Sequence, residues 1–423
     1  MRARPLCGRS RVDSPREGDV LPSIDRVSAR KILDSRGDPT IEVDVFAGRV
    51  HGRAAAPSGA STGAHEARAF PDGGADAALA FVRDHVAPKL RGHDIGDQAG
   101  LDRMLRAIDG TEAFARMGGN VAVAVSLAAA KAAAADAGQP LYRYVGGPLP
   151  PKMPFPFGNV IGGGRHAIGG TAIQEFMAVS QGPTIAESVF ANARVHRVVR
   201  EALAKKFPHE PLGRGDEGAW IAKLSDEDAL GVLVDACERV GSEERFSVRP
   251  ALDLAASEFF RGGQYRYRDH ALTPDKQIEF LERLVSDYGL FSLEDPLDQD
   301  DFDGFARLTE AVGARCKVIG DDLFVTRVDR LRRGIAMRAA NAILIKPNQI
   351  GTLSDTRAAV DLAHSAGYAT VMSHRSGETT DDTIAHLAVA WGCLGIKTGA
   401  VGGERTAKLN ELIRIEEELR GGT

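Results

Sequence analysis

The chain has 423 residues, enough for a barrel and a partner domain, with 43% hydrophobic and 26% charged residues, as in globular proteins. Its net charge of −5 argues against nucleic acid as a partner, and no apolar run reaches the roughly 20 residues of a membrane-spanning helix. The four cysteines are far apart, which excludes a zinc knuckle or disulfide framework and favours a reducing, cytoplasmic location.

Residues 1–22 hold five arginines and lack the apolar central run of a secretory signal, so we predict a disordered extension. The pattern then predicts strands over 31–33 and 40–47, joined by the turn "DSRGDP". Helices are predicted over 77–92 and 120–138, with Asn120 as the N-cap of the second. The proline-rich stretch "GGPLPPKMPFPF" predicts a domain boundary near residue 150.

Beyond residue 150, six short apolar runs each end in a polar or charged residue and alternate with helical stretches. These ends are Asp253, Glu294, Asp321, Lys346, His374 and Lys397, about 23–41 residues apart. A strand, loop and crossover helix need roughly 25–30 residues, so the spacing predicts repeated strand–helix units and a parallel sheet. If the sheet closes into a barrel, these strand ends share one face, where barrel enzymes hold their active sites.

The first three strand ends are carboxylates: Asp253, Glu294 and Asp321. Buried carboxylates that converge need a cation between them, and an oxygen-only ligand set suits Mg²⁺. Helix N-caps or surface salt bridges are the alternative interpretation of the same three residues.

Lys346 and Lys397 end later strands of the series. Beside Mg²⁺ the pKa of a lysine falls, so a neutral amine becomes available as a base; the alternative is a counter-ion to the acidic residues. The loop "SHRSG", residues 373–377, offers an imidazole, a guanidinium and a hydroxyl, which suit a phosphate or carboxylate unless the loop is only a structural turn.

Three glycine-containing loops add candidates. "GRGDEGAW" carries Asp216 and Glu217, and an unpaired carboxylic acid there could protonate a leaving group. "PSGASTGAHEA", residues 57–67, has the small hydroxyl-bearing residues of a lid. "FGNVIGGGRHAIGGTAIQEF", residues 157–176, lacks the Lys-Ser/Thr ending of a phosphate-binding loop, and its strand follows the glycines, so we interpret it as a second lid carrying His166.

Together these motifs resemble the enolase (phosphopyruvate hydratase) family, archaeal-type, from about residue 24 to residue 419. The likeness rests on "ILDSRGDPTIEVDV", "PSGASTGAHEA", "QEFM", "GDEG", "LDLAASEFF", "LEDPLDQDD", "GDDLFVT", "LIKPNQIGTLS", "SHRSGET", "IKTG" and "ERTAKLNELIRIEEEL". It implies an α/β protein: an enolase-type N-terminal α+β domain over residues 23–150, then a C-terminal (β/α)8-type, TIM-like barrel over residues 151–423. The first barrel strands are expected in an unusual arrangement.

The resemblance also implies a reaction, the Mg²⁺-dependent dehydration of 2-phospho-D-glycerate to phosphoenolpyruvate through a metal-stabilised enolate, with two Mg²⁺ per active site. The implied ligands are Asp253, Glu294 and Asp321 for the first Mg²⁺ and Ser61 for the second. Lys346 matches the base that takes the C2 proton, and Glu217, supported by Glu175, matches the acid at the C3 hydroxyl.

The substrate implied is a small phosphorylated carboxylic acid. Lys397 matches its carboxylate contact, Arg375 and Ser376 match phosphate contacts, and His166 and His374 match active-site histidines. Enolases form dimers or octamers, and Glu42 and Arg414 fall where the family commonly forms a salt bridge across the dimer, so a homodimer or octamer is expected.

The loop at 159–170 departs from the family pattern at Gly162, Arg165, Ile168 and Gly169. An added arginine near the substrate would favour phosphate or phosphonate. The alternative function is therefore an enolase-like enzyme of phosphonate secondary metabolism, such as carboxyphosphonoenolpyruvate synthase. An acid-sugar dehydratase or racemase would not be expected to carry "SGASTG", "GDEG" and "IKTG" together, and a non-catalytic scaffold need not keep Lys346 and Glu217.

Overall fold

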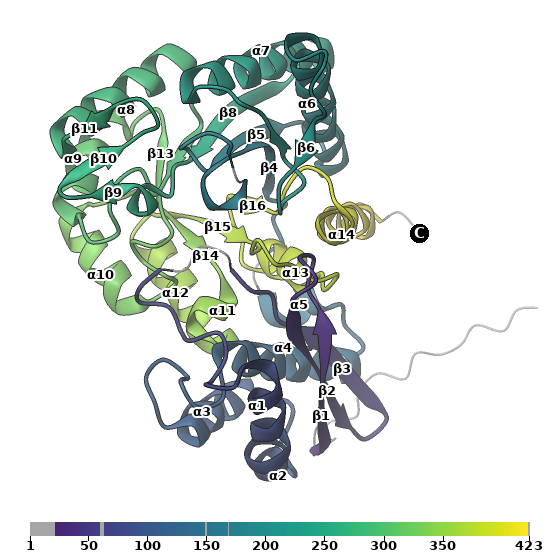
Figure 1. Cartoon of the computed structure of the whole chain (residues 1–423). Coiled ribbons are helices and arrows are strands. Elements are labelled where there is room, and N and C mark those ends of the chain that lie inside the picture. The colour runs from purple at the N-terminus through teal and green to yellow at the C-terminus, as the bar shows by residue number, and fades with distance from the viewer. Residues whose placement is uncertain (1–21, 60–62, 149, 168, 422–423) are drawn as a thin grey trace, which may run out of the picture.

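The computed structural model describes residues 22–59, 63–148, 150–167 and 169–421. The predicted extension therefore lies outside the described residues except for its last residue, and so do Ser61 and Ile168. Figure 1 shows a smaller N-terminal unit, coloured purple and blue, beneath a barrel that runs from teal to yellow. Within the described residues, no helix combines the length and apolarity that crossing a membrane requires.

The N-terminal unit is an antiparallel sheet covered by helices. Its strands, in the order β1-β2-β3, are β1 (Ile24–Leu33), β2 (Pro39–Ala47) and β3 (Val50–Ala55). Its helices are α1 (Gly74–Phe81), α2 (Ala87–Leu90), α3 (Gln98–Asp109), α4 (Gly119–Asp136) and α5 (Leu141–Gly146). The predicted turn between β1 and β2 is held by Asp34, whose carboxylate accepts the backbone N–H groups of Arg36 and Asp38, each at 2.9 Å.

Helix α4 is almost wholly buried because the sheet packs directly on its backbone. A Cβ on Gly52 of β3 would lie 2.0 Å from the carbonyl oxygen of Ala128, so the alanine-rich sequence is a close-packing surface. The prediction of Asn120 as N-cap was wrong: the cap is Gly118, and the Asn120 amide donates instead to Ser58 Oγ at 3.1 Å.

The helix predicted over 77–92 is divided into α1, a π-helical turn (Val82–Val86) and α2. Pro88 lies in the first turn of α2, and its ring nitrogen has no N–H to donate to the preceding turn. The change in helical geometry just before Pro88 accommodates that missing donor.

Eight strands close into a barrel, which confirms the predicted fold class. They are β4 (Phe155–Gly162), β5 (Glu175–Gln181), β8 (Ser247–Asp253), β12 (Ser292–Glu294), β13 (Lys317–Gly320), β14 (Ala342–Ile345), β15 (Ala369–Ser373) and β16 (Gly395–Lys397). Strand β5 runs antiparallel to both β4 and β8, and the remaining pairs, including the closing pair of β16 with β4, are parallel. This is the unusual arrangement expected of the first strands.

The barrel interior is apolar at its centre. Phe157 of β4 and Phe291 meet edge to face with their ring centroids 5.6 Å apart. A Cβ on Gly395 of β16 would lie 2.3 Å from the Phe157 ring, so a glycine is needed where this ring crosses the barrel.

Helices surround the barrel, and a small sheet lies at its rim (Figure 1). The helices are α6 (Ile185–Lys206), α7 (Asp226–Glu244), α8 (Pro274–Tyr288), α9 (Phe302–Val312), α10 (Val328–Met337), α11 (Pro347–Ile350), α12 (Leu353–Ser365), α13 (Thr383–Ala390) and α14 (Gly403–Leu419). The small sheet consists of β9 (Phe260–Arg261), β10 (Gln264–Arg266) and β11 (Ala271–Leu272). A separate hairpin of β6 (Gly213–Arg214) and β7 (Trp220–Ile221) extends the barrel sheet from β4.

Candidate active site

The predicted strand ends occur where the spacing placed them. Asp253, Glu294 and Lys397 are the last residues of β8, β12 and β16, and the other three directly follow β13, β14 and β15. Four of them line one cavity, and the other two, Glu294 and Asp321, contact its lysines. The lining includes His166, Glu175, Glu217, Asp253, Lys346, His374, Arg375, Ser376 and Lys397. The space between them is about 20 Å³, enough for a water molecule, so a larger ligand must separate these side chains.

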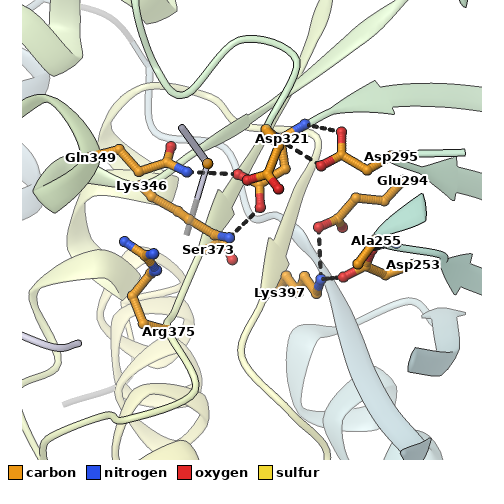
Figure 2. A network of polar contacts seen from close by, with 12 residues as sticks. Asp253, Ala255, Glu294, Asp295, Asp321, Lys346, Gln349, Ser373, Arg375 and Lys397 are labelled. Atoms are coloured by element: carbon orange, nitrogen blue, oxygen red, sulfur yellow. Dashed lines mark hydrogen bonds and ion pairs between the residues drawn. The ribbon is translucent and has the colours of Figure 1, made fainter. Parts of the chain in front are cut away.

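Lys397 lies at the centre of the acidic residues (Figure 2). Its Nζ is 2.8 Å from Glu294 Oε1, 2.9 Å from Asp253 Oδ2 and 3.1 Å from Glu175 Oε1. Burial would lower the pKa of Lys397, but these three carboxylates outweigh it and raise the pKa well above its usual value. Burial, together with the charge of Asp253, raises the pKa of Glu294 well above normal. Three buried carboxyl groups thus share the single ammonium group of Lys397.

Lys346 forms a second ion pair, with Asp321. The other oxygen of Asp321 accepts from Gln349 Nε2 at 2.9 Å, and Asp295 holds the loop from behind by accepting the backbone N–H groups of Asp321 and Asp322 at 2.9 and 2.7 Å. Burial alone would lower the pKa of Lys346, but the charge of Asp321 raises it overall. The neutral amine predicted for Lys346 therefore requires that Asp321 be engaged by another cation.

The three predicted metal ligands offer the oxygen donors that a divalent cation takes, although in this structure Lys397 and Lys346 form ion pairs with them. Glu294 is paired in register with Asp253, and Asp321 follows the next strand, so three carboxylates lie side by side on one barrel face. Glu294 Oε2 is buried and, among the described residues, has no hydrogen-bond partner. Oxygen donors of this kind suit Mg²⁺. Asp295, Asp321 and Asp322 also lie close enough to hold an ion, but both oxygens of Asp295 already accept backbone N–H groups.

Glu175 and Glu217 form a buried pair of carboxyl groups beside His166. One ligand atom from each of the three residues lies within 4.8 Å of the others. Burial and the charge of Glu217 raise the pKa of Glu175 well above its usual value. Burial acts in the same direction on Glu217, but nearby His374 and His166 outweigh it and lower its pKa. Two carboxyl groups whose pKa values are driven apart in this way hold one proton between them.

Arg405 determines which nitrogen of His374 carries the proton. Its Nη1 is 2.9 Å from His374 Nδ1, and because a guanidinium can only donate, Nδ1 must accept. Burial lowers the pKa of His374 to about 3, so the neutral ring carries its proton on Nε2, 3.3 Å from Glu217 Oε2. Asn159 Nδ2 donates to the same oxygen at 3.1 Å. The other oxygen, Oε1, lies 3.7 Å from His166 Nδ1, and the lowered pKa of Glu217 leaves the proton of the carboxyl pair on Glu175.

Arg375 already holds an anionic group from the N-terminal unit. Its Nη2 lies 3.1 and 3.0 Å from the two carboxylate oxygens of Glu66, and its Nη1 donates to Asn348 Oδ1 at 2.9 Å. A guanidinium in this position suits a phosphate equally well. The carbonyl oxygen of Ser376 accepts from Arg405 at 2.6 Å, which fixes the loop between β15 and α13.

The described departures from the family motif, Gly162, Arg165 and Gly169, are not part of the cavity lining. Gly162 pairs with Glu175 between β4 and β5. Arg165 is 57% exposed and its Nη1 lies 3.5 Å from Glu258, so in this arrangement it meets a carboxylate of its own chain instead of the cavity. Ile168 lies outside the described residues.

Several residues around the cavity were missed from the sequence. Arg405 and Glu66 lie in the quoted motifs "ERTAKLN" and "GAHEA", and Asp295 lies in "LEDP", but polar residues in a helix or loop are usually solvated, so nothing in the pattern marked them. Fully buried Arg405 connects two loops, and Asn159 is reached only through the packing of β4 against the Glu217 loop.

Comparisons with known proteins agree with this geometry. Residues 24–145 match the family model described as "Enolase, N-terminal domain", and residues 151–423 match "Enolase, C-terminal TIM barrel domain". A protein named Enolase from Methanothermobacter thermautotrophicus is 55% identical over 94% of this chain and 97% of its own length. Enolases from Natronomonas pharaonis and Picrophilus torridus are 53% and 50% identical over 93% and 92% of this chain, and 98% and 97% of their own. The resemblance predicted from the motifs is confirmed, and the chain belongs to the enolase family.

Proposed function

We propose that this protein is a hydro-lyase, a phosphopyruvate hydratase that converts 2-phospho-D-glycerate into phosphoenolpyruvate and water. The observation that carries the proposal is a single cavity lined by two lysines, an arginine and two carboxyl groups. The pKa of one of these carboxyl groups is raised and that of the other is lowered. The match to proteins named Enolase along nearly the whole chain favours this reaction over the phosphonate alternative. In the same proposal, residues 23–150 form the N-terminal domain and residues 151–423 the catalytic barrel.

In the proposed reaction, Lys346 removes the proton from C2 of the substrate, and the C3–OH bond breaks with its electron pair on oxygen. The carboxyl pair of Glu175 and Glu217 supplies the proton that makes the departing hydroxide a water molecule, through Glu217 Oε1. Lys397 pairs with the substrate carboxylate, and Arg375 and Ser376 bind the phosphate. His166 and His374 flank the carboxyl pair and help to keep Glu217 ionised while Glu175 holds the proton.

We propose Asp253, Glu294 and Asp321 as ligands of one Mg²⁺ and Ser61 as a contributor to a second. When bound, Mg²⁺ supplies positive charge that stabilises the doubly charged carboxylate formed when C2 loses its proton. A metal cation on Asp321 would also release Lys346 from its ion pair, so the amine could act as the base. The buried oxygen of Glu294 and the converging strand ends support this assignment.

A direct assay tests the proposal. The protein is mixed with 2-phosphoglycerate and Mg²⁺, and the absorbance of the enol phosphate product is followed. We expect turnover that stops with a chelator and returns with Mg²⁺. Lys346→Ala and Glu217→Gln should each lower kcat by about 10²–10⁴-fold, the usual contribution of a positioned acid or base.

Loss of kcat should come without loss of folding in Glu217→Gln, which keeps the shape of the side chain. A folded, Mg²⁺-loaded wild-type protein that gives no product from 2-phosphoglycerate would refute the hydratase function. Turnover of a phosphonate analogue by that same preparation would then establish the alternative.

A further inference from the structure

Residues of helix α6 and of the short hairpin of β6 and β7 line a groove. Figure 1 shows α6 and β6 at the upper right. The groove is open to solvent and has a volume of about 700 Å³, within the range of small-molecule sites. The hairpin carries Glu217 in its turn, so this groove lies against the outer side of the proposed acid loop. The walls include His196, Arg197 and Arg200 of α6, and Arg214 and Trp220 of the hairpin.

The groove is cationic, although the whole chain is acidic. Its lining holds three arginines and no aspartate or glutamate, whereas the chain carries a net charge of −5. Arg197, Arg200 and Arg214 form no ion pair with any residue that the structure describes. Arg194, one turn of α6 before Arg197, lies outside the groove lining and contacts both Glu243 and Glu244, so the carboxylates of this region lie away from the groove. The three guanidinium groups are exposed around one groove, so they can offer several charge-assisted hydrogen bonds to one anion.

The cationic groups are arranged around one aromatic ring. The guanidinium carbons of Arg200 and Arg214 are 6.0 and 5.9 Å from the centroid of the Trp220 ring. Arg214 and Trp220 are directly paired across the hairpin, which presents both side chains to the same face. This combination of forked donors and a half-buried indole matches a ligand that carries phosphate groups and has a planar part.

The groove is connected to the proposed acid loop through His196. Trp220 Nε1 donates to the carbonyl oxygen of His196 at 2.9 Å, and His196 Nε2 lies 2.9 Å from the carbonyl oxygen of Gly218, to which it donates. Gly218 follows Glu217 in the chain, and its Cβ position would lie 2.7 Å from the carbonyl oxygen of Val401, so the turn has little room to move independently. A ligand that draws α6 and the hairpin together therefore acts directly on the turn that holds Glu217.

We propose that this groove binds a small polyphosphate anion, of the nucleoside triphosphate class, and that its occupancy alters catalysis through the hairpin that carries Glu217. The binding part of the proposal is independent of the reaction, and the effect on catalysis rests on the proposed function. Phosphate groups lie on Arg197, Arg200 and Arg214, and the nucleobase lies toward Trp220.

The binding test uses tryptophan fluorescence of the full chain without substrate or Mg²⁺. The chain has two tryptophans, so Trp391→Phe leaves Trp220 as the only reporter. ATP, tripolyphosphate and adenosine are titrated at constant ionic strength. We expect saturable binding of ATP, weaker binding of tripolyphosphate and none of adenosine, and isothermal titration calorimetry checks the same proteins without relying on fluorescence.

The double variant Arg197→Gln, Arg200→Gln should weaken ATP binding at least about tenfold, because each substitution removes a charge-assisted hydrogen bond to a phosphate group. Arg103→Gln is the matched control, an exposed arginine on α3 outside the groove, and should bind like the parent. Absence of saturable ATP binding, adenosine binding equal to ATP, or equal losses in the double variant and the control would each overturn the site.

The effect on catalysis is measured separately, with excess Mg²⁺ to compensate for chelation by ATP. A change in kcat for the parent that is absent from the double variant supports the connection to Glu217. Unchanged kcat at ATP concentrations that saturate the groove overturns that connection. Because binding is read without substrate, a protein that fails the hydratase assay still gives a valid binding result.

Discussion

At the scale of single residues, the site depends on side chains that can donate hydrogen bonds but cannot accept them. A guanidinium and an ammonium can only donate, so Arg405 and Lys397 assign the roles of the groups around them without any need to locate hydrogens. Arg405, fully buried, donates to His374 and to the carbonyl oxygens of Arg375 and Ser376. The proton arrangement around Glu217 is thus determined from outside the cavity.

The tautomer of His374 can be tested directly. In protein labelled with ¹⁵N-histidine, we expect the His374 signals to show a protonated Nε2 and an unprotonated Nδ1 at neutral pH, because Arg405 faces Nδ1. His374→Gln identifies those signals among the 11 histidines. A protonated Nδ1 in the wild-type protein would contradict the assignment.

Replacing Arg405 tests whether this arrangement matters for the reaction. Arg405→Lys keeps the charge but cannot reach the ring nitrogen and both carbonyl oxygens together, so we expect kcat to fall at least about tenfold. Added guanidinium ion should restore part of the loss and return the His374 signals to the wild-type pattern. A lysine variant with wild-type kcat and unchanged His374 signals would show that Arg405 acts only in folding.

At the scale of elements, features set by nearby residues could be predicted from the sequence, and features set by contacts between distant residues could not. The strand ends were predictable because spacing along the chain sets the length of each strand–helix unit, and all six candidates occur at or directly after their strands. The resemblance implied only that the first barrel strands are arranged unusually. It did not identify β5 as the antiparallel strand, and nothing local to Glu175–Gln181 sets strand direction. Asn120 failed as an N-cap because Ser58, 62 positions away, accepts its amide.

Packing of β3 on α4 gives a test of an element contact. Gly52→Ala places a methyl group about where the Ala128 carbonyl oxygen lies, so we expect the free energy of unfolding to fall by about 1–3 kcal/mol or more. Gly231→Ala on α7 is the control: no heavy atom lies within 4 Å of its Cβ position, and alanine favours a helix, so stability should stay constant or rise by up to about 1 kcal/mol. Denaturant unfolding measures both, and equal stabilities would refute the close packing.

At the scale of the whole molecule, the N-terminal unit completes the cavity of the barrel. Gly59 is part of its lining, Glu66 contacts Arg375, and the backbones of Ser58 and Gly377 exchange two hydrogen bonds of 2.8 Å. These partners are separated by about 300 positions, and a pattern of residue types carries no information about which distant loop they meet. The sequence could therefore predict that both loops are functional. It could not predict that Glu66 pairs with Arg375, the residue expected to bind the substrate phosphate.

The assembly of the chain is the last prediction. In a single chain, Arg414 is 60% exposed and lies 2.5 Å from Glu411 on its own helix, an exposed pairing worth about 0–1 kcal/mol, and Glu42 contacts Arg30. We predict that Arg414 meets Glu42 of a second copy, so light scattering should give two, or eight, times the 45.0 kDa chain mass. Arg414→Glu should raise the dimer dissociation constant, and adding Glu42→Arg should partly restore it because the charges are exchanged. Arg420→Glu, 56% exposed at the end of the same helix, should leave assembly unchanged. A 45.0 kDa particle at micromolar concentration would refute the prediction, since the two residues would then have no partner copy to meet.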